Sequence, residues 1–120
     1  MDNLKSKIEN HQIVLEKYIR DLAYEYNNSL GSTKNYHAII DLKSNHFQFV
    51  RIGWQDDKFV YSVLLHLSIN TETGNIWILQ NNTEIEIDEE LKVIANIPKT
   101  HFVLGFYPAY VRKYSEYAVA

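Results

Sequence analysis

Five histidines are the first residues of this sequence that could do chemistry, because imidazole binds metal ions and transfers protons near neutral pH. They stand at positions 11, 37, 46, 66 and 101, and no two of them have the H-x-H or H-x-x-x-H spacing typical of metal ligands. His37 and His46 flank a predicted hairpin and could together supply two ligands, fewer than the three or four of a stable zinc site. The histidine pattern therefore predicts no metal centre.

A catalytic centre is also not predicted. His66 lies on the half-polar face of a predicted strand and could act as a general base, but no nucleophile motif accompanies it. A hydrogen-bonded or interface histidine is the favoured interpretation. The phosphate-binding, dinucleotide-binding, zinc-protease and hydrolase signatures are missing, and so is cysteine, which excludes thiolate chemistry and disulfides. We expect a protein that is not an enzyme and binds no cofactor.

An acidic cluster could in principle bind a cation; its members are Glu84, Glu86, Asp88, Glu89 and Glu90. The cluster falls at the predicted start of a helix, where negative side chains oppose the positive end of the helix dipole. We therefore interpret it as a solvated helix face.

The C-terminal segment FYPAYVRKYSEYAVA (106–120) combines rings and positive charge. Arg112 and Lys113 stand among Tyr107, Tyr110 and Tyr114, a pairing of cation and ring that protein hot spots and nucleic-acid contacts both use. The alternative is structural: the tyrosines would lie over the sheet, and Arg112 would pair with an acid inside the fold.

Two tryptophans, Trp54 and Trp77, lie on predicted strands and could belong to a stacking platform for bases. No basic groove accompanies them, so contact with a protein partner or core packing is favoured. The sequence thus predicts a set of candidate partner-binding residues, namely Tyr107, Tyr110, Arg112, Lys113, Tyr114, Trp54, Trp77 and His66.

Hydrophobic periodicity predicts the elements that must position these residues. Apolar side chains recur three or four residues apart from Asn3 to about Tyr26, which indicates a long amphipathic helix. Alternation then predicts four strands with short turns, at 36–42, 46–54, 59–70 and 75–80. The turn before the last strand contains Gly74, which is suited to a positive φ angle.

The rest of the chain should be mainly helical. Thr83 and Glu86 have the spacing of a capping box, so a second helix is expected there and should stop near Asn96, before Pro98. FVLGFY (102–107) should be extended or turn-like, and Pro108 should open a short helix reaching about Tyr114. The predicted fold is α+β: a long N-terminal helix, a four-stranded antiparallel meander, one capped helix and a short C-terminal helix.

Size and charge limit the functional classes. The 120 residues suit one domain, 1–120, and the net charge of −3 argues against bulk electrostatic binding of nucleic acid. No apolar run is long enough to cross a membrane and no secretory leader is recognisable, so we expect a cytoplasmic protein. A sheet with two fairly apolar faces needs cover on both sides, which predicts a homo-oligomer, a dimer.

An ordered set of segments resembles the XisI family over residues 36–120. NIPKTHFVLGFYPAYVRKYSEYAVA (96–120) is similar to the family's C-terminal segment almost position by position, and the G-W, LLHLSI, NIWILQ and T-E elements come before it in the family's order. Two departures stand out: Tyr107-Pro108-Ala109-Tyr110 replaces His-Pro-Pro-Glu, and Asn81-Asn82-Thr83-Glu84 replaces Asp-Gly-Thr-Glu. The loss of that histidine and glutamate argues against chemistry shared at the tail.

The resemblance implies a role in DNA rearrangement. XisI proteins are controlling factors for excision of the fdxN element in heterocyst-forming cyanobacteria, where a separate site-specific recombinase cuts and joins the DNA. An XisH-like protein is the implied partner, the recombinase is a further one, and contact with DNA would be indirect or weak. The rival interpretation is an accessory protein that binds DNA directly through Arg112 and Lys113. We expect the tail to fold back on its own domain and to help form the docking surface for the XisH-like partner.

Overall fold

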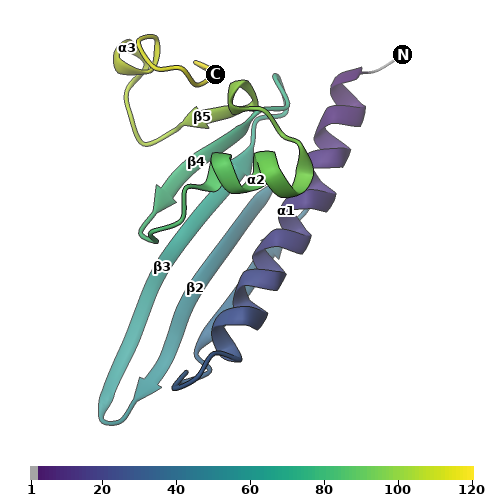
Figure 1. Ribbon diagram of the computed structural model, residues 1–120. Helices are drawn as coiled ribbons and strands as arrows, with labels where there is room; N and C mark the ends of the chain where they lie inside the picture. The colour runs from purple at the N-terminus through teal and green to yellow at the C-terminus, as the bar shows by residue number, and fades with distance from the viewer. Residues whose placement is uncertain (1–2) are drawn as a thin grey trace.

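The computed structural model describes residues 3–120 and consists of one mixed sheet with its two longer helices on one face. The helices are α1 (Asn3–Asn27), α2 (Ile87–Ala95) and α3 (Ala109–Arg112), and a short 3-10 helix spans Lys99–His101. The strands are β1 (Tyr36–Asp41), β2 (His46–Gln55), β3 (Lys58–Ile69), β4 (Ile76–Asn81) and β5 (Phe102–Leu104). Figure 1 shows the start of α1, the C-terminus and α3 at one end of the molecule, and the tip of the β2–β3 hairpin at the other.

Helix α1 is the long amphipathic helix that the periodicity predicts. Its buried stripe packs on the sheet and consists of His11, Leu15, Tyr18, Ile19, Leu22 and Ala23. The helix ends at Asn27, whose side-chain amide donates to the carbonyl of Tyr36 and accepts from its N–H. This pair of hydrogen bonds fixes the turn from α1 into β1.

Strands β1 to β4 form the predicted antiparallel meander. The side chains that face α1 include the fully buried Phe47, Phe49, Leu65 and Leu67. Gly74 has the expected positive φ, +75°, and a Cβ there would lie 2.9 Å from Lys7 Cδ. The prediction of four elements with short turns is therefore confirmed for this part of the sheet.

The fold class is confirmed as α+β, but the sheet has five strands rather than four. β5 pairs with β4 in parallel, and the connection between them contains α2, as parallel strands require a crossover. Because β5 is only three residues long, alternation in the sequence could not reveal it. The segment we expected to be extended or turn-like is an edge strand of a mixed sheet.

The predicted capping box is wrong. Helix α2 begins at Ile87, and its N-cap, Glu86, makes no side-chain capping bond. Thr83 Oγ1 instead accepts from the N–H of Ile85 and donates to Asn81 Oδ1, at 3.1 and 2.6 Å. The side chain of Thr83 therefore forms hydrogen bonds within the turn that contains Asn81 and does not cap the helix. The predicted end is correct, because Asn96 caps the helix in the left-handed conformation with φ 56°.

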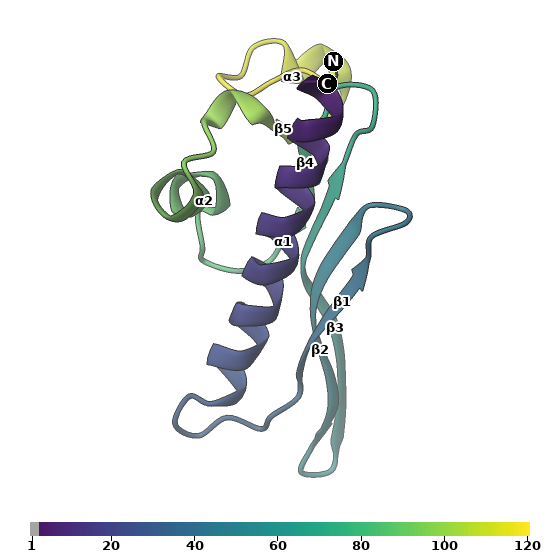
Figure 2. The same ribbon diagram turned by 90° about the vertical axis from the view of Figure 1, so that its right-hand side faces the viewer.

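Figure 2 shows α1 and α2 on the same side of the sheet. We call the opposite side the far face. The C-terminal segment covers the far face over β4 and β5, where Arg112 lies on Trp77, and over most of β1, β2 and β3 this face carries no helix within residues 3–120. None of the helices in that range has the length and apolar character needed to span a bilayer.

A buried histidine joins α1 to the turn between β3 and β4. His11 Nδ1 donates to the carbonyl oxygen of Gly74 at 2.8 Å, and His11 Nε2 lies 3.4 Å from His101 Nδ1. Burial lowers the pKa of both histidines below the ordinary 6.5, because the imidazolium form loses hydration. Both rings are therefore neutral in the folded protein at neutral pH.

Folding should weaken as the pH falls. The unfolded chain takes up protons through pH 6.5, whereas folded His11 and His101 take them up only at lower pH, so acid favours the unfolded state. Urea unfolding should give a smaller free energy at about pH 5.5 than at about pH 7.5. The difference should shrink in His11→Asn, which retains a donor toward Gly74, and remain in His37→Asn, at an exposed histidine. A free energy independent of pH would contradict this assignment.

Candidate partner-docking site

The C-terminal segment folds back on its own domain beside β5. The N–H of Ala118 donates to the carbonyl of Phe102 at 2.8 Å, and Ala118 forms a parallel bridge with Val103. The buried side chain of Asn75 donates to the carbonyl of Ala120 at 2.6 Å. The tail is thus held on the edge of the sheet, as expected, instead of hanging free.

Arg112 holds the tail closed through neutral groups. Its Nε donates to the carbonyl of Val119 at 2.9 Å, and its Nη1 donates to the carbonyl of Tyr107 at 2.7 Å. The guanidinium carbon lies 4.8 Å from the centre of the Trp77 ring, within the range of a cation–π contact. The structural alternative for Arg112 is therefore supported, but with carbonyls and a ring as partners where we had expected an acid.

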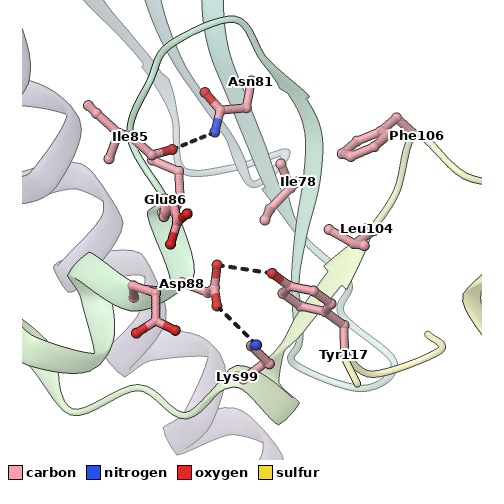
Figure 3. A pocket seen from close by; sticks show the side chains of 11 residues that line it. Ile78, Asn81, Ile85, Glu86, Asp88, Lys99, Leu104, Phe106 and Tyr117 are labelled. Carbon is pink, nitrogen blue, oxygen red and sulfur yellow. Dashed lines mark hydrogen bonds and ion pairs between the residues drawn. The ribbon is translucent and has the colours of Figure 1, made fainter. Parts of the chain in front are cut away.

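Tyr117 anchors the other side of the tail, as Figure 3 shows. Its hydroxyl donates to Asp88 Oδ1 at 3.1 Å, and Lys99 Nζ lies 4.0 Å from Asp88 Oδ2 and 3.8 Å from Glu116 Oε1. Burial and the negative charge of Asp88 raise the pKa of Tyr117 to about 12. The phenol therefore remains protonated at neutral pH and donates this hydrogen bond.

A cavity of about 460 Å³ lies between the start of α2, β4 and the tail. Figure 3 shows Ile78, Leu104, Phe106 and Tyr117 on one side of it and acidic side chains of α2 on the other. Residues 3–120 contain no group of three or more side chains placed to hold a metal ion. The cavity is a mixed polar and apolar hollow beside the tail, and the hydrogen bond from Tyr117 to Asp88 connects two of its walls.

The outer surface of the tail is aromatic and exposed. Tyr110 and Tyr114 are 71% and 82% exposed, and the neighbouring Tyr107 and Lys113 are exposed as well. We call these four residues the tail face. The anchors described above hold this face in place, so binding to it requires no ordering of a loose chain end.

The other predicted contact residues do not join the tail face. Trp54 lies near the tip of the β2–β3 hairpin, at the opposite end of the molecule in Figure 1. Trp77 lies beneath Arg112 as part of the tail's support. His66 is half-buried on the far face, where its Nε2 lies 2.9 Å from His46 Nδ1. The structure thus separates Trp54 and His66 from the residues of the tail.

The two-ligand site considered for His37 and His46 is not formed. His37 lies opposite Val50 and His46 lies opposite Asp41, so the two histidines are at different ends of the β1–β2 pair. His46 forms its hydrogen bond with His66 instead. Burial and the neighbouring His46 lower the pKa of His66.

Asp88 was missed as a site residue, because we had assigned the whole acidic cluster to a solvated face. Asp88, Glu89 and Glu90 do occupy the first turn of α2, whereas Glu84 and Glu86 precede the helix. Asp88 is only 8% exposed and binds Tyr117. Its position next to Ile87, which begins the buried stripe of α2, is the one signal in the sequence that could have indicated burial.

The chain is similar to known proteins over nearly its whole length. The family described as XisI protein matches residues 1–119. The crystal structure of an XisI-like protein from Anabaena variabilis ATCC 29413 has 29% identity and a TM-score of 0.77, covering 94% of this chain and 99% of that one. The structure of the fdxN element excision controlling factor XisI from the same organism has 31% identity and a TM-score of 0.72, covering 95% and 99%. The search among curated proteins found no match.

Proposed function

This chain belongs to the XisI family, and on that premise we propose that it is a non-catalytic controlling factor in the excision of a DNA element. The proposal rests mainly on one observation: the tail presents exposed tyrosines on a rigid support. Rigid aromatic side chains are typical anchors of protein–protein contacts. A solved relative with 31% identity is an fdxN element excision controlling factor. We infer the process, excision of a DNA element, from this relative.

The proposed partner of the tail face is an XisH-like protein, with a site-specific recombinase as a further member of the assembly. Tyr110 and Tyr114 would enter pockets on the XisH-like protein, and Lys113 would add a positive charge at the rim. The replacement of the family's His-Pro-Pro-Glu by Tyr107-Pro108-Ala109-Tyr110 enlarges the aromatic part of this surface. In this proposal the chain acts by contact with its partners and catalyses no chemical step itself.

Direct DNA binding by the same segment is less well supported. The donors of Arg112 that would meet a phosphate are directed to the carbonyls of Val119 and Tyr107. Lys99 lies close to Asp88 and Glu116, which reduces its attraction for an anion. Of the two cations in the tail, Lys113 is the one that could still bind a phosphate, whereas tight DNA binding uses many phosphate contacts.

A reconstituted excision reaction tests the proposal. The recombinase, the XisH-like protein and this chain are mixed with a DNA element, and the joined ends are amplified across the new junction. We expect excision to depend on this chain, and the isolated chain neither to cut DNA nor to produce a salt-dependent mobility shift. Excision that continues unchanged when the chain is omitted would contradict the proposed role. A strong shift by the isolated chain would favour the DNA-binding alternative.

A further inference from the structure

The far face of the β2–β3 hairpin carries large apolar side chains that nothing covers within residues 3–120. Trp54 is 65% exposed, Phe59 49% and Tyr61 71%, and the rings of Trp54 and Phe59 lie 5.3 Å apart. The strand register places these residues on one side of the sheet, since Trp54 lies opposite Phe59 and Ile52 lies opposite Tyr61. The hairpin extends beyond the end of α1 in Figure 2, so neither helix can shield it.

This apolar surface continues toward the middle of the sheet. Val50 lies opposite both Val63 and His37, so these residues share the far face, and the exposed Ile39 lies two residues along β1 from His37 on the same face. We call Ile39, Ile52, Trp54, Phe59, Tyr61 and Val63 the ribbon face. The members on β2 and β3 form an apolar strip, and Ile39 adds to it from β1, where it lies opposite Gln48.

The ribbon face carries no formal charge. Among the charged neighbours on the same strands, Arg51 is on the other side, 5.7 Å from the ring of Tyr36, and Lys58 pairs with Gln55 beside the turn. Asp41 shares the far face with Ile39, but it lies opposite His46 at the end of β1 that is remote from Trp54, Phe59 and Tyr61. In a twofold dimer the same patch of each subunit contacts that of the other, so a charge near the axis would lie close to an identical charge. An uncharged strip avoids that repulsion, although the whole chain has a net charge of −3.

The area of the strip is also compatible with an interface between two copies of this chain. At these exposures the three rings leave about 300–450 Å² of surface in water, which is about half of the roughly 800 Å² that each partner gives to a stable interface. Ile39, Ile52 and Val63 lie beside the rings and add to it. A patch of this size is comparable to the largest apolar patch on a typical monomer, and such patches often have a function.

We propose that the ribbon face is a twofold interface at which a second copy of this chain packs its own ribbon face. Trp54, Phe59 and Tyr61 of one copy cover the same rings of the other, and the sheets pack face to face. The tail face lies at the opposite end of the molecule (Figure 1) and stays open for a different partner. The surface for self-association is therefore separate from the surface proposed for the XisH-like protein.

Sedimentation of the whole chain tests the proposal. The wild type should sediment with twice its 14.1 kDa at concentrations from about 1 to about 100 µM. Tyr61→Lys places a positive charge in the apolar strip and should shift the dissociation constant at least about 100-fold toward monomer. Tyr24→Lys is the matched control, because Tyr24 on α1 is also 71% exposed and lies outside the strip. It should remain dimeric.

Trp54→Gln provides a second variant, at the tip of the hairpin and away from the core, and should also favour the monomer. The far-ultraviolet circular dichroism of both variants is compared with that of the wild type to show that they are folded. A wild type that is monomeric over the whole range would overturn the proposal, as would folded Tyr61→Lys and Trp54→Gln proteins that remain dimeric. If the wild type is monomeric and Tyr61→Lys loses the XisH-like protein, the ribbon face belongs to that partner instead.

Discussion

Replacing Tyr110 and Tyr114 together with alanine is expected to weaken binding of the XisH-like protein by about 30-fold or more. Both side chains are largely exposed, so their truncation should leave the fold unchanged. Central aromatic anchors typically contribute 2 kcal/mol or more to an interface, which corresponds to a factor of about 30 in the dissociation constant. The measurement is a binding titration of the purified variant against the XisH-like protein.

The control for this prediction is Tyr24→Ala. Tyr24 has the same residue type and the same 71% exposure as Tyr110, but it lies near the end of α1 that is remote from the tail in Figure 1. Its loss should change binding less than threefold. Equal losses in the tail variant and the control would show that tyrosines act nonspecifically. Unchanged binding in the tail variant would remove the tail face from the proposed mechanism.

Replacing Phe102 with alanine should lower the free energy of unfolding by about 3–5 kcal/mol. Phe102 is completely buried in β5, and its truncation would leave a cavity where α2, β4 and the tail meet. Domains of this size are stable by only about 5–15 kcal/mol, so the loss is a large part of the total. Equilibrium unfolding in urea, followed by circular dichroism, measures the change.

Phe106→Ala is the comparison for Phe102→Ala. Phe106 is four residues further along the same segment, but half of its surface is exposed. The free energy of unfolding should therefore fall by less than about 1 kcal/mol. If both substitutions had the same effect, β5 would not be part of the cooperative core, and the placement of the tail on its edge would be wrong.

The long elements could be predicted from the sequence because their patterns repeat. Helix α1 covers about seven turns with apolar residues at regular spacing, and strands β1 to β4 have alternating runs bounded by turn residues, although the strand pairing shifts register at Phe49/Val50 and at His66/Leu67. The stop of α2 at Asn96 was predictable from local chemistry. These features depend on residues close together in the chain.

The remaining features depend on residues far apart in the chain. β5 has only three residues and forms by pairing with the free edge of β4. No local sequence pattern indicates this pairing. The role of Arg112 follows from Trp77, 35 positions earlier, and from two carbonyls at other points of the tail. Asp88 was interpreted as solvated because its partner, Tyr117, is 29 residues away. The separation of Trp54 from the tail face has the same origin.

The most direct test of the account is a calorimetric titration of the wild-type chain with the XisH-like protein in the absence of DNA. If this protein controls excision by contact, the titration should show saturable binding that persists at about 0.3 M salt, because the tail face is mainly aromatic. No heat of binding without DNA, together with a salt-sensitive complex between the isolated chain and DNA, would contradict the account.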